Sequence, residues 1–365
     1  MIKIMTGAVS RRRFPAVAQP QLGWLDHMVT TLLGTWLLIG LFVDGWAHQN
    51  LSELETFFTP WHGVFYSGFL ASAAWNGWLA LRDRGAAPGS IVVPLGYGLG
   101  LIGLAIFAAG GVGDMLWHEA FGIEAGIDAL LSPTHLVLLT GAMLFLSSPL
   151  RALWLGGDPA RDARSLWTFL PVMLSLTLVL TLVLFFLTYA SAFVHVGMLG
   201  EGISASTSPE GAERTGHLAQ EVGLGSILVT NVVLVAPMLL ALRRWLLPFG
   251  SVAMLFTVPA VLSAGLLEFS YAFVVPAALL AGLLADVLIR VLRPSPQRLP
   301  ALRLFAALVP TILWGGYVLS AALAGALQWS LELSAGIAVL TGMGGYGLSI
   351  LTTPPVAGGE PPERR

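Results

Sequence analysis

Residues 166–194 read LWTFLPVMLSLTLVLTLVLFFLTYASAFV and contain no charged side chain. A helix needs about 20 apolar residues to cross a hydrocarbon core of ~30 Å, so this stretch is long enough to span a bilayer. Similar runs recur along the chain, in which 56% of the 365 residues are apolar and only 10% are charged. So few charges cannot cover the surface of a soluble globular protein. The sequence therefore predicts an integral membrane protein.

The apolar runs are rich in Leu, Ala and Gly, and they lack the alternation in ~10-residue units that is typical of transmembrane β-strands. They predict an all-α fold, a polytopic transmembrane bundle of about ten spans arranged as helical hairpins. Residues 1–24 and 352–365 are predicted as tails flanking a transmembrane domain at 25–351. The predicted spans are 25–47, 61–81, 92–117, 133–150, 166–194, 218–242, 249–266, 269–290, 303–325 and 332–351.

Lysine and arginine predict the orientation, because they accumulate in cytoplasmic loops. With the N-terminus inside and ten spans, all 18 Lys and Arg residues except Arg214 fall on the cytoplasmic side. We therefore expect a multi-pass protein of the cell (inner) membrane with both termini in the cytoplasm.

Two stretches of the N-terminal half repeat one pattern of metal-ligand residue types. Each begins with Asp-x-x-x-His at the end of a predicted span, and each continues after a linker with an acidic residue and Thr/Ser-Pro-x-His. The spacing within both halves of the pattern is identical, and only the linkers differ, by three residues. The Asp and His residues of the two copies are Asp44, His48, His62, Asp114, His118 and His135.

The matched spacing indicates an internal duplication, with copies at about 44–78 and 114–151. A degenerate third hairpin is predicted at 166–242, where His195 and His217 lie near the ends of two spans and Ser191 replaces Asp. In the predicted topology all of these residues lie on the outer side of the membrane. We therefore expect them near one another at the extracytoplasmic face.

The spacing has a chemical meaning. An Asp and a His four residues apart share one face of a helix, so both can approach one ion. Thr59-Pro60 and Ser132-Pro133 are typical helix starts, with a hydroxyl N-cap and proline in the first turn. Two imidazoles and a carboxylate suit Zn, Cu(II) or non-haem Fe and leave coordination positions open. The pattern thus predicts metal ligation by Asp44, His48 and His62, and by their counterparts in the second copy.

Four further acidic residues can orient an imidazole or accept a proton beside these ligands. They are Glu55 in the first copy and Asp128, Glu119 and Glu124 in the second. A plainer interpretation stays open, in which the polar residues only occupy the membrane interface and Asp44 accepts a hydrogen bond from His48. Asn76 and Asn231 lie within predicted spans and are expected to bridge helices.

Asp44, His48 and His62 resemble the metal-binding motif in the C subunit of particulate methane and ammonia monooxygenases, and 114–135 matches it more loosely. The resemblance implies a copper site that serves dioxygen activation in the membrane. It covers only these two stretches. The duplication, the ten predicted spans and the His spacing depart from that family, so its substrate and subunits are not carried over.

The leading hypothesis is a membrane metalloprotein with His/Asp sites at the extracytoplasmic face, acting as a copper- or iron-dependent oxidoreductase. Copper is favoured over iron or zinc as the cofactor. A metal-ion transporter or delivery protein, and a non-catalytic scaffold subunit, remain alternatives. The expected partners are the lipid bilayer and other membrane subunits, and no nucleic acid. Cysteine is absent, which excludes disulfides and thiolate metal ligands. The Gly-rich patches 110–113 and 342–347 follow no predicted strand, so they do not indicate a phosphate-binding loop, and nothing in the sequence indicates a nucleotide or flavin.

Overall fold

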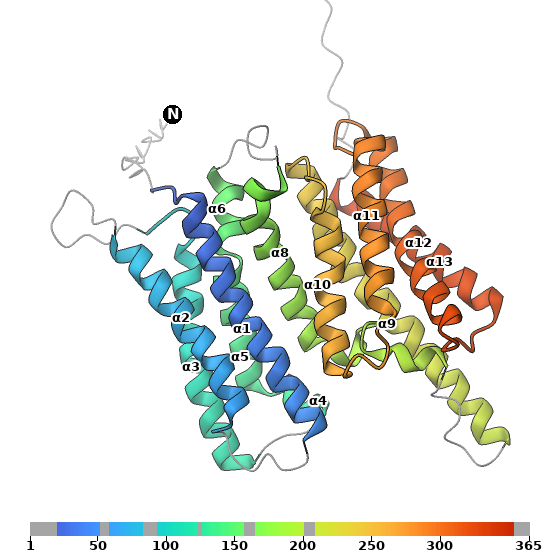
Figure 1. Ribbon diagram of the computed structural model, residues 1–365, viewed down its shortest axis with the longest axis horizontal. Coiled ribbons are helices and arrows are strands. Elements are labelled where there is room, and N and C mark those ends of the chain that lie inside the picture. Colours follow the sequence, from blue (N-terminus) through green and yellow to red (C-terminus); the bar gives the residue numbers. More distant parts are fainter. Residues whose placement is uncertain are drawn as a thin grey trace, which may run out of the picture.

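The computed structural model describes residues 20–51, 58–82, 93–122, 126–156, 165–200 and 209–353, with the side chains of 128–129 and 209–215 left out. In this part of the chain the fold is entirely helical (Figure 1). The elements are α1 (Trp24–Asn50), α2 (Pro60–Arg82), α3 (Gly98–Phe121), α4 (Ile127–Leu131), α5 (Pro133–Leu146), α6 (Ser148–Gly156), α8 (Leu166–Phe186), η1 (Thr188–Ala190), η2 (His195–Leu199), α9 (Pro209–Arg244), α10 (Ser251–Leu266), α11 (Val274–Leu292), α12 (Leu299–Leu323) and α13 (Leu331–Thr352).

Seven of these helices are long and apolar enough to cross a membrane, and an eighth span results if the bent pair α5 and α6 is counted as one. Each of the ten predicted spans overlaps a helix or the bent pair, but the predicted span 166–194 extends eight residues past the end of α8 at Phe186. However, two of these helices are not among the seven. Helix α2 is long enough to span a membrane but less apolar than the seven, and α10 is apolar but has only 16 residues. The all-helical fold is therefore confirmed, with seven helices that could span a membrane, whereas the count of ten spans stays a prediction.

The helices form two groups that meet along α8. In Figure 1, α1, α2, α3 and α5 lie on one side and α9, α11, α12 and α13 on the other, with α8 and α10 between them. Leu178 and Leu182 of α8 belong to the N-terminal core, while Met173 and Leu180 belong to the C-terminal core. In the most apolar window of α8, 78% of the residues are buried. The charge-free stretch therefore forms the wall that both cores share.

Glycines let the helices of the first hairpin touch. A Cβ atom at Gly40 of α1 would lie 2.7 Å from the Cα of Phe65 in α2, and one at Gly68 of α2 would lie 2.7 Å from the Cα of Leu37. Real Cβ atoms do not approach backbone this closely. Small residues at such crossings permit the tight packing on which helix association in a membrane depends.

The second hairpin, α3 with α5, is packed by glycines at the same offsets from its motif. A Cβ atom at Gly110 would lie 3.2 Å from the Cγ of Leu138, and one at Gly141 would lie 2.6 Å from the backbone N of Phe107. Gly110 precedes the motif Asp by four residues and Gly141 follows the second His by six, as Gly40 and Gly68 do in the first copy. Both hairpins therefore bring the end of one helix close to the start of the next.

A 42° bend separates α5 from α6. Pro149 causes it, because proline has no N–H to continue the helix and its ring crowds the preceding turn. The guanidinium of Arg151 donates to the backbone oxygens of Leu144, at 2.6 Å, and Gly96, at 3.1 Å. One carbonyl group at the break thus accepts from an arginine, which also binds the segment before α3, at the end of the hairpin remote from the motif.

Polar residues join the helices of the C-terminal half. Trp314 of α12 donates from Nε1 to Oδ1 of Asn231 at 3.0 Å, and Asn231 donates to the backbone oxygen of Thr341 in α13 at 3.4 Å. The prediction that Asn231 bridges helices is confirmed. Asn76, by contrast, donates to the Ser72 oxygen of its own helix, because the position one turn earlier is within reach of its short side chain.

Asp286 of α11 caps a helix that is not its own. Its carboxylate accepts hydrogen bonds from the backbone N–H groups of Gly250, Val252 and Ala253, at 2.9, 3.0 and 3.1 Å, at the start of α10. These N–H groups have no partner within the helix, and its N-terminus favours negative charge. A buried carboxylate thereby anchors α10 against α11.

We expect Asp286→Ala to lower the free energy of unfolding by about 3 kcal/mol, because three buried N–H groups lose a charged acceptor. Reversible unfolding in detergent micelles measures the change. Val287→Ala on the exposed face of the same helix is the matched control and should shift stability by less than about 0.5 kcal/mol. Equal effects of the two substitutions would contradict the capping role.

Candidate metal centre

The first group of predicted metal ligands lies where α1 ends and α2 begins. Asp44 and His48 lie one turn apart near the end of α1, and His62 is the third residue of α2. The Nε2 atoms of His48 and His62 lie 3.7 and 3.4 Å from Oδ2 of Asp44. Both imidazoles thus face one carboxylate oxygen, as the spacing predicts.

The second group repeats this geometry where α3 ends and α5 begins. The Nε2 atoms of His118 and His135 lie 3.7 and 3.3 Å from Oδ1 of Asp114. The two imidazole rings lie 5.9 Å apart at 62°, against 5.6 Å and 63° for the ring pair of the first group. We call the two groups the first triad (Asp44, His48, His62) and the second triad (Asp114, His118, His135).

The helix starts hold the second imidazole of each triad. Ser132 is the N-cap of α5, and its Oγ accepts from the backbone N–H of His135 at 3.4 Å and lies 2.7 Å from Nδ1 of the same residue. Thr59 does the same for His62, at 3.1 Å from its backbone N and 3.3 Å from its Nδ1. One hydroxyl therefore both caps the helix and orients the ring that follows it.

Hydroxyl groups connect the residues of the second triad. The Thr134 hydroxyl donates to Oδ1 of Asp114 at 3.0 Å, and its oxygen lies 3.2 Å from Oγ of Ser132. Ser132 Oγ in turn lies 2.7 Å from Nδ1 of His135, whose Nε2 faces Oδ1 of Asp114. In the tautomer with the proton on Nδ1, Nε2 presents its lone pair to a metal ion beside the carboxylate.

His118 is oriented by the backbone. Its Nδ1 lies 3.3 Å from the carbonyl oxygen of Gly122, which follows the last residue of α3. Gly122 has a φ of +82°, a conformation that residues with a side chain rarely adopt. The glycine ends the helix and leaves its carbonyl group within reach of the imidazole.

The triads fit a transition-metal ion. Ligand atoms bound at ~2.0–2.2 Å to one ion lie about 3.4 Å apart at tetrahedral angles, close to the separations from the carboxylate oxygens described above. Within each triad all three ligand atoms lie within 4.8 Å of one another. In addition, Oδ1 of Asp44 is buried and has no hydrogen-bond partner among the described residues. An unpaired buried carboxylate oxygen is costly, and a bound cation removes that cost.

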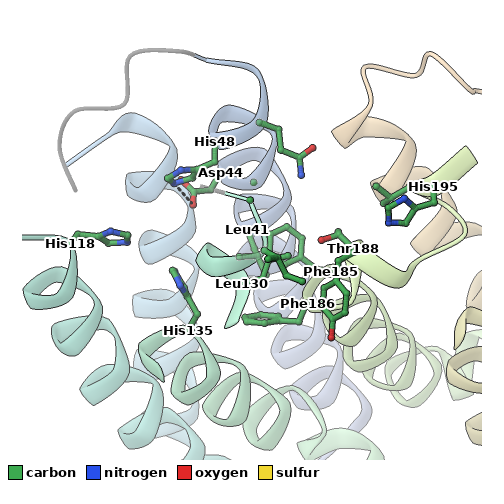
Figure 2. Close-up of a pocket in the computed structure, with 16 residues that line it drawn as sticks. Leu41, Asp44, His48, His118, Leu130, His135, Phe185, Phe186, Thr188 and His195 are labelled. Carbon is green, nitrogen blue, oxygen red and sulfur yellow. Dashed lines mark ion pairs between the residues drawn. The ribbon is translucent and has the colours of Figure 1, made fainter. Parts of the chain in front are cut away.

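Both triads border the same hollow region of the molecule. A cavity of about 400 Å³ is lined by Asp44 and His48 of the first triad and by His118 and His135 of the second. A smaller cavity of about 30 Å³ lies deeper and is lined by both aspartates. Figure 2 shows the imidazoles of His48, His118 and His135 gathered on one side of the larger cavity, with Leu41 and Leu130 beside them.

The third predicted histidine pair belongs to neither triad. His195 begins η2 and lines the larger cavity on the side away from the triads (Figure 2), and neither triad includes it. His217 lies exposed on α9 and does not line this cavity. The predicted span 166–194 ends as an α-helix at Phe186, and η1 and η2 follow it, so His195 lies in η2 and not at the end of a spanning helix.

Of the four acidic residues predicted beside the ligands, only Glu119 has a described side chain. Glu119 is exposed, and Glu55 and Glu124 lie outside the described residues, as does the side chain of Asp128. The sequence predicted Thr59 and Ser132 as helix caps but not their contacts with the imidazoles, and it gave no sign of the role of Thr134. The signal was available for Ser132 and Thr59, which stand three residues before a histidine, but only the fold reveals that Thr134 reaches α3.

The chain matches no protein-family model, no curated protein and no solved structure. The resemblance to the monooxygenase C subunit thus rests on the motif residues alone.

We expect Ser132→Ala to weaken metal binding at the second triad by about 10- to 100-fold, because His135 loses the hydroxyl that orients it. Ser132→Thr should restore most of the affinity, since Thr59 fills the equivalent position of the first triad. Titration of the metal-depleted protein with Cu(II), followed by electron paramagnetic resonance, measures the affinity. If Ser132→Ala and wild type bind equally, the hydroxyl has no part in orienting the ligand.

Proposed function

We propose that the protein is an integral membrane metalloprotein in which each triad binds one transition-metal ion, and that it acts as an oxidoreductase. The observation that carries the proposal is the repetition of one ligand geometry, with two Nε2 atoms facing a single carboxylate oxygen in both hairpins. In the second triad, hydrogen bonds hold both imidazoles through Nδ1 and leave Nε2 to the ion. Interfacial polar residues without a shared ligand have no reason to adopt this arrangement twice.

The ligand set supports redox chemistry at an open metal site. Two imidazoles and a carboxylate are suited to copper, iron or zinc, and three protein ligands leave positions for water, dioxygen or a substrate. Copper is favoured because sites of this kind bind divalent copper most tightly among first-row metals. Bound copper supplies one-electron redox chemistry. The chain's own contribution is a carboxylate that offsets the charge of the ion within an apolar region.

We also propose that the two N-terminal hairpins are copies of one ancestral unit. Support comes from the glycines Gly40 and Gly110, and Gly68 and Gly141, which stand at equal offsets and make close contacts with corresponding positions of the partner helix. The proposal retains ten spans and cytoplasmic termini in the cell (inner) membrane. Arginines such as Arg82, at the end of α2 remote from His62, support this orientation.

The core beneath the triads favours an enzyme over a transporter. Leu37, Phe65, Phe69, Phe107 and Phe145 pack in the N-terminal core, each with an exposed fraction of 8% or less. An ion that passed inward from the triads would have to cross this apolar layer, in which these side chains offer no ligand. A scaffold subunit is the remaining alternative, and metal analysis distinguishes it.

Metal analysis of the purified full-length protein tests the proposed function. We expect about two equivalents of copper after copper-replete expression, and about one equivalent in His48→Ala or His118→Ala, because each variant loses a ligand of one triad only. Gln49→Ala, at an exposed position next to His48, is the matched control and should keep both ions. A protein that folds but holds no copper, iron or zinc would overturn the proposal.

The two triads should also differ in affinity. Asp114 receives the Thr134 hydrogen bond, whereas Trp61 occupies the equivalent position of the first triad and Oδ1 of Asp44 has no described partner. We expect Thr134→Val to lower copper affinity at the second triad roughly tenfold and to leave the first unchanged. Two resolved binding steps in a calorimetric titration, of which only one moves in the variant, would demonstrate this. A shift of both steps or of neither would contradict it.

A further inference from the structure

We infer that the 400 Å³ cavity is a binding site for a small, mostly apolar molecule that carries one hydrogen-bonding group, and that His195 receives this group. The inference rests on the proposed function, since it names the class of substrate for the same site. It assigns His195 to the substrate rather than to a metal ion.

The chemistry of the cavity walls supports this class of ligand. The triads form one wall, and the rest is largely apolar, with Leu41, Leu130, Phe185 and Phe186 among the lining residues. Figure 2 shows these side chains between the triads and His195. Sites for small molecules have this character, with an apolar lining and few polar groups that fix the orientation of the ligand.

A close contact shapes this wall. A Cβ atom at Gly45 would lie 2.7 Å from Cε2 of Phe185, so only glycine lets this ring lie against the turn of α1 that carries Asp44. The aromatic ring therefore stands directly beside the first triad. An apolar molecule held against Phe185 would lie next to the open coordination positions of the ion.

His195 lies on the far side of the cavity, and Gln49, Thr188 and Tyr189 are further polar residues of its lining. It is half-buried, and its Nε2 is buried without a hydrogen-bond partner among the described residues. The protein thus orients His62 and His135 through hydroxyl groups but leaves this nitrogen of His195 unsatisfied. Leaving a buried polar atom unpaired costs free energy, and a turn of the half-buried imidazole toward the cavity would let Nε2 pair with a ligand hydroxyl or carbonyl group.

The test uses two probes of nearly equal shape, 4-fluorophenol and 4-fluorotoluene, which differ in one hydroxyl group. Full-length protein in lipid nanodiscs is titrated with each probe, in copper-loaded and chelator-treated form, and ¹⁹F resonances are compared with those of empty nanodiscs. We expect saturable binding of 4-fluorophenol by both forms, with strong paramagnetic broadening only in the copper-loaded form.

Two variants test the site. His195→Phe should weaken 4-fluorophenol binding roughly three- to tenfold, the value of one hydrogen bond, while 4-fluorotoluene binding and copper content stay unchanged. Leu41→Trp should fill the cavity and abolish saturable binding of both probes. The matched control is Leu32→Trp, at a position 54% exposed on the same helix, which should bind as wild type does.

The outcomes separate this inference from the proposed function. Normal copper content without saturable probe binding would overturn the inference alone. The inference would also fail if His195→Phe lowered the affinity for both probes equally, or if this variant lost copper. Absence of copper with saturable binding by the chelator-treated protein would instead overturn the metal assignment and keep the pocket.

Discussion

Each N-terminal hairpin holds one carboxylate against two imidazoles within an otherwise apolar helix pair, and the rest of the site depends on this contact. Asp114 is almost fully buried, and Asp44 nearly so. A carboxylate in such surroundings is costly unless positive charge and hydrogen bonds compensate it. Imidazole nitrogens lie on two sides of each carboxylate, and a cation held among them would provide that compensation. The contact therefore explains why the helix ends converge where they do.

The packing of the hairpins makes the convergence possible. Gly40 and Gly68 let α1 and α2 approach to backbone contact, and Gly141 does the same for α3 and α5. Without these close crossings, a histidine at the start of one helix could not reach an aspartate at the end of another. The hydroxyl caps Thr59 and Ser132 then set the direction of the rings. In each hairpin the ligand geometry therefore depends on both helix packing and helix capping.

The C-terminal half has a different role in the same molecule. The charge-free helix α8 is buried between the two cores, and its end delivers Phe185 and Phe186 to the wall of the cavity. The segment that follows is not a regular helix, and it places His195 opposite the triads (Figure 2). The C-terminal half thereby borders the candidate metal centre on one side and completes a pocket that the two hairpins alone would leave open.

The sequence by itself determined the helical membrane fold and the membership of the two triads. Both follow from local rules, because apolar length sets a span and residues four apart share a helix face. Only the tertiary structure decided that Thr134 reaches Asp114, that Asp286 caps a neighbouring helix, and that His195 joins neither triad. These facts depend on contacts between segments far apart in the chain, and no local spacing encodes the distance between two helices.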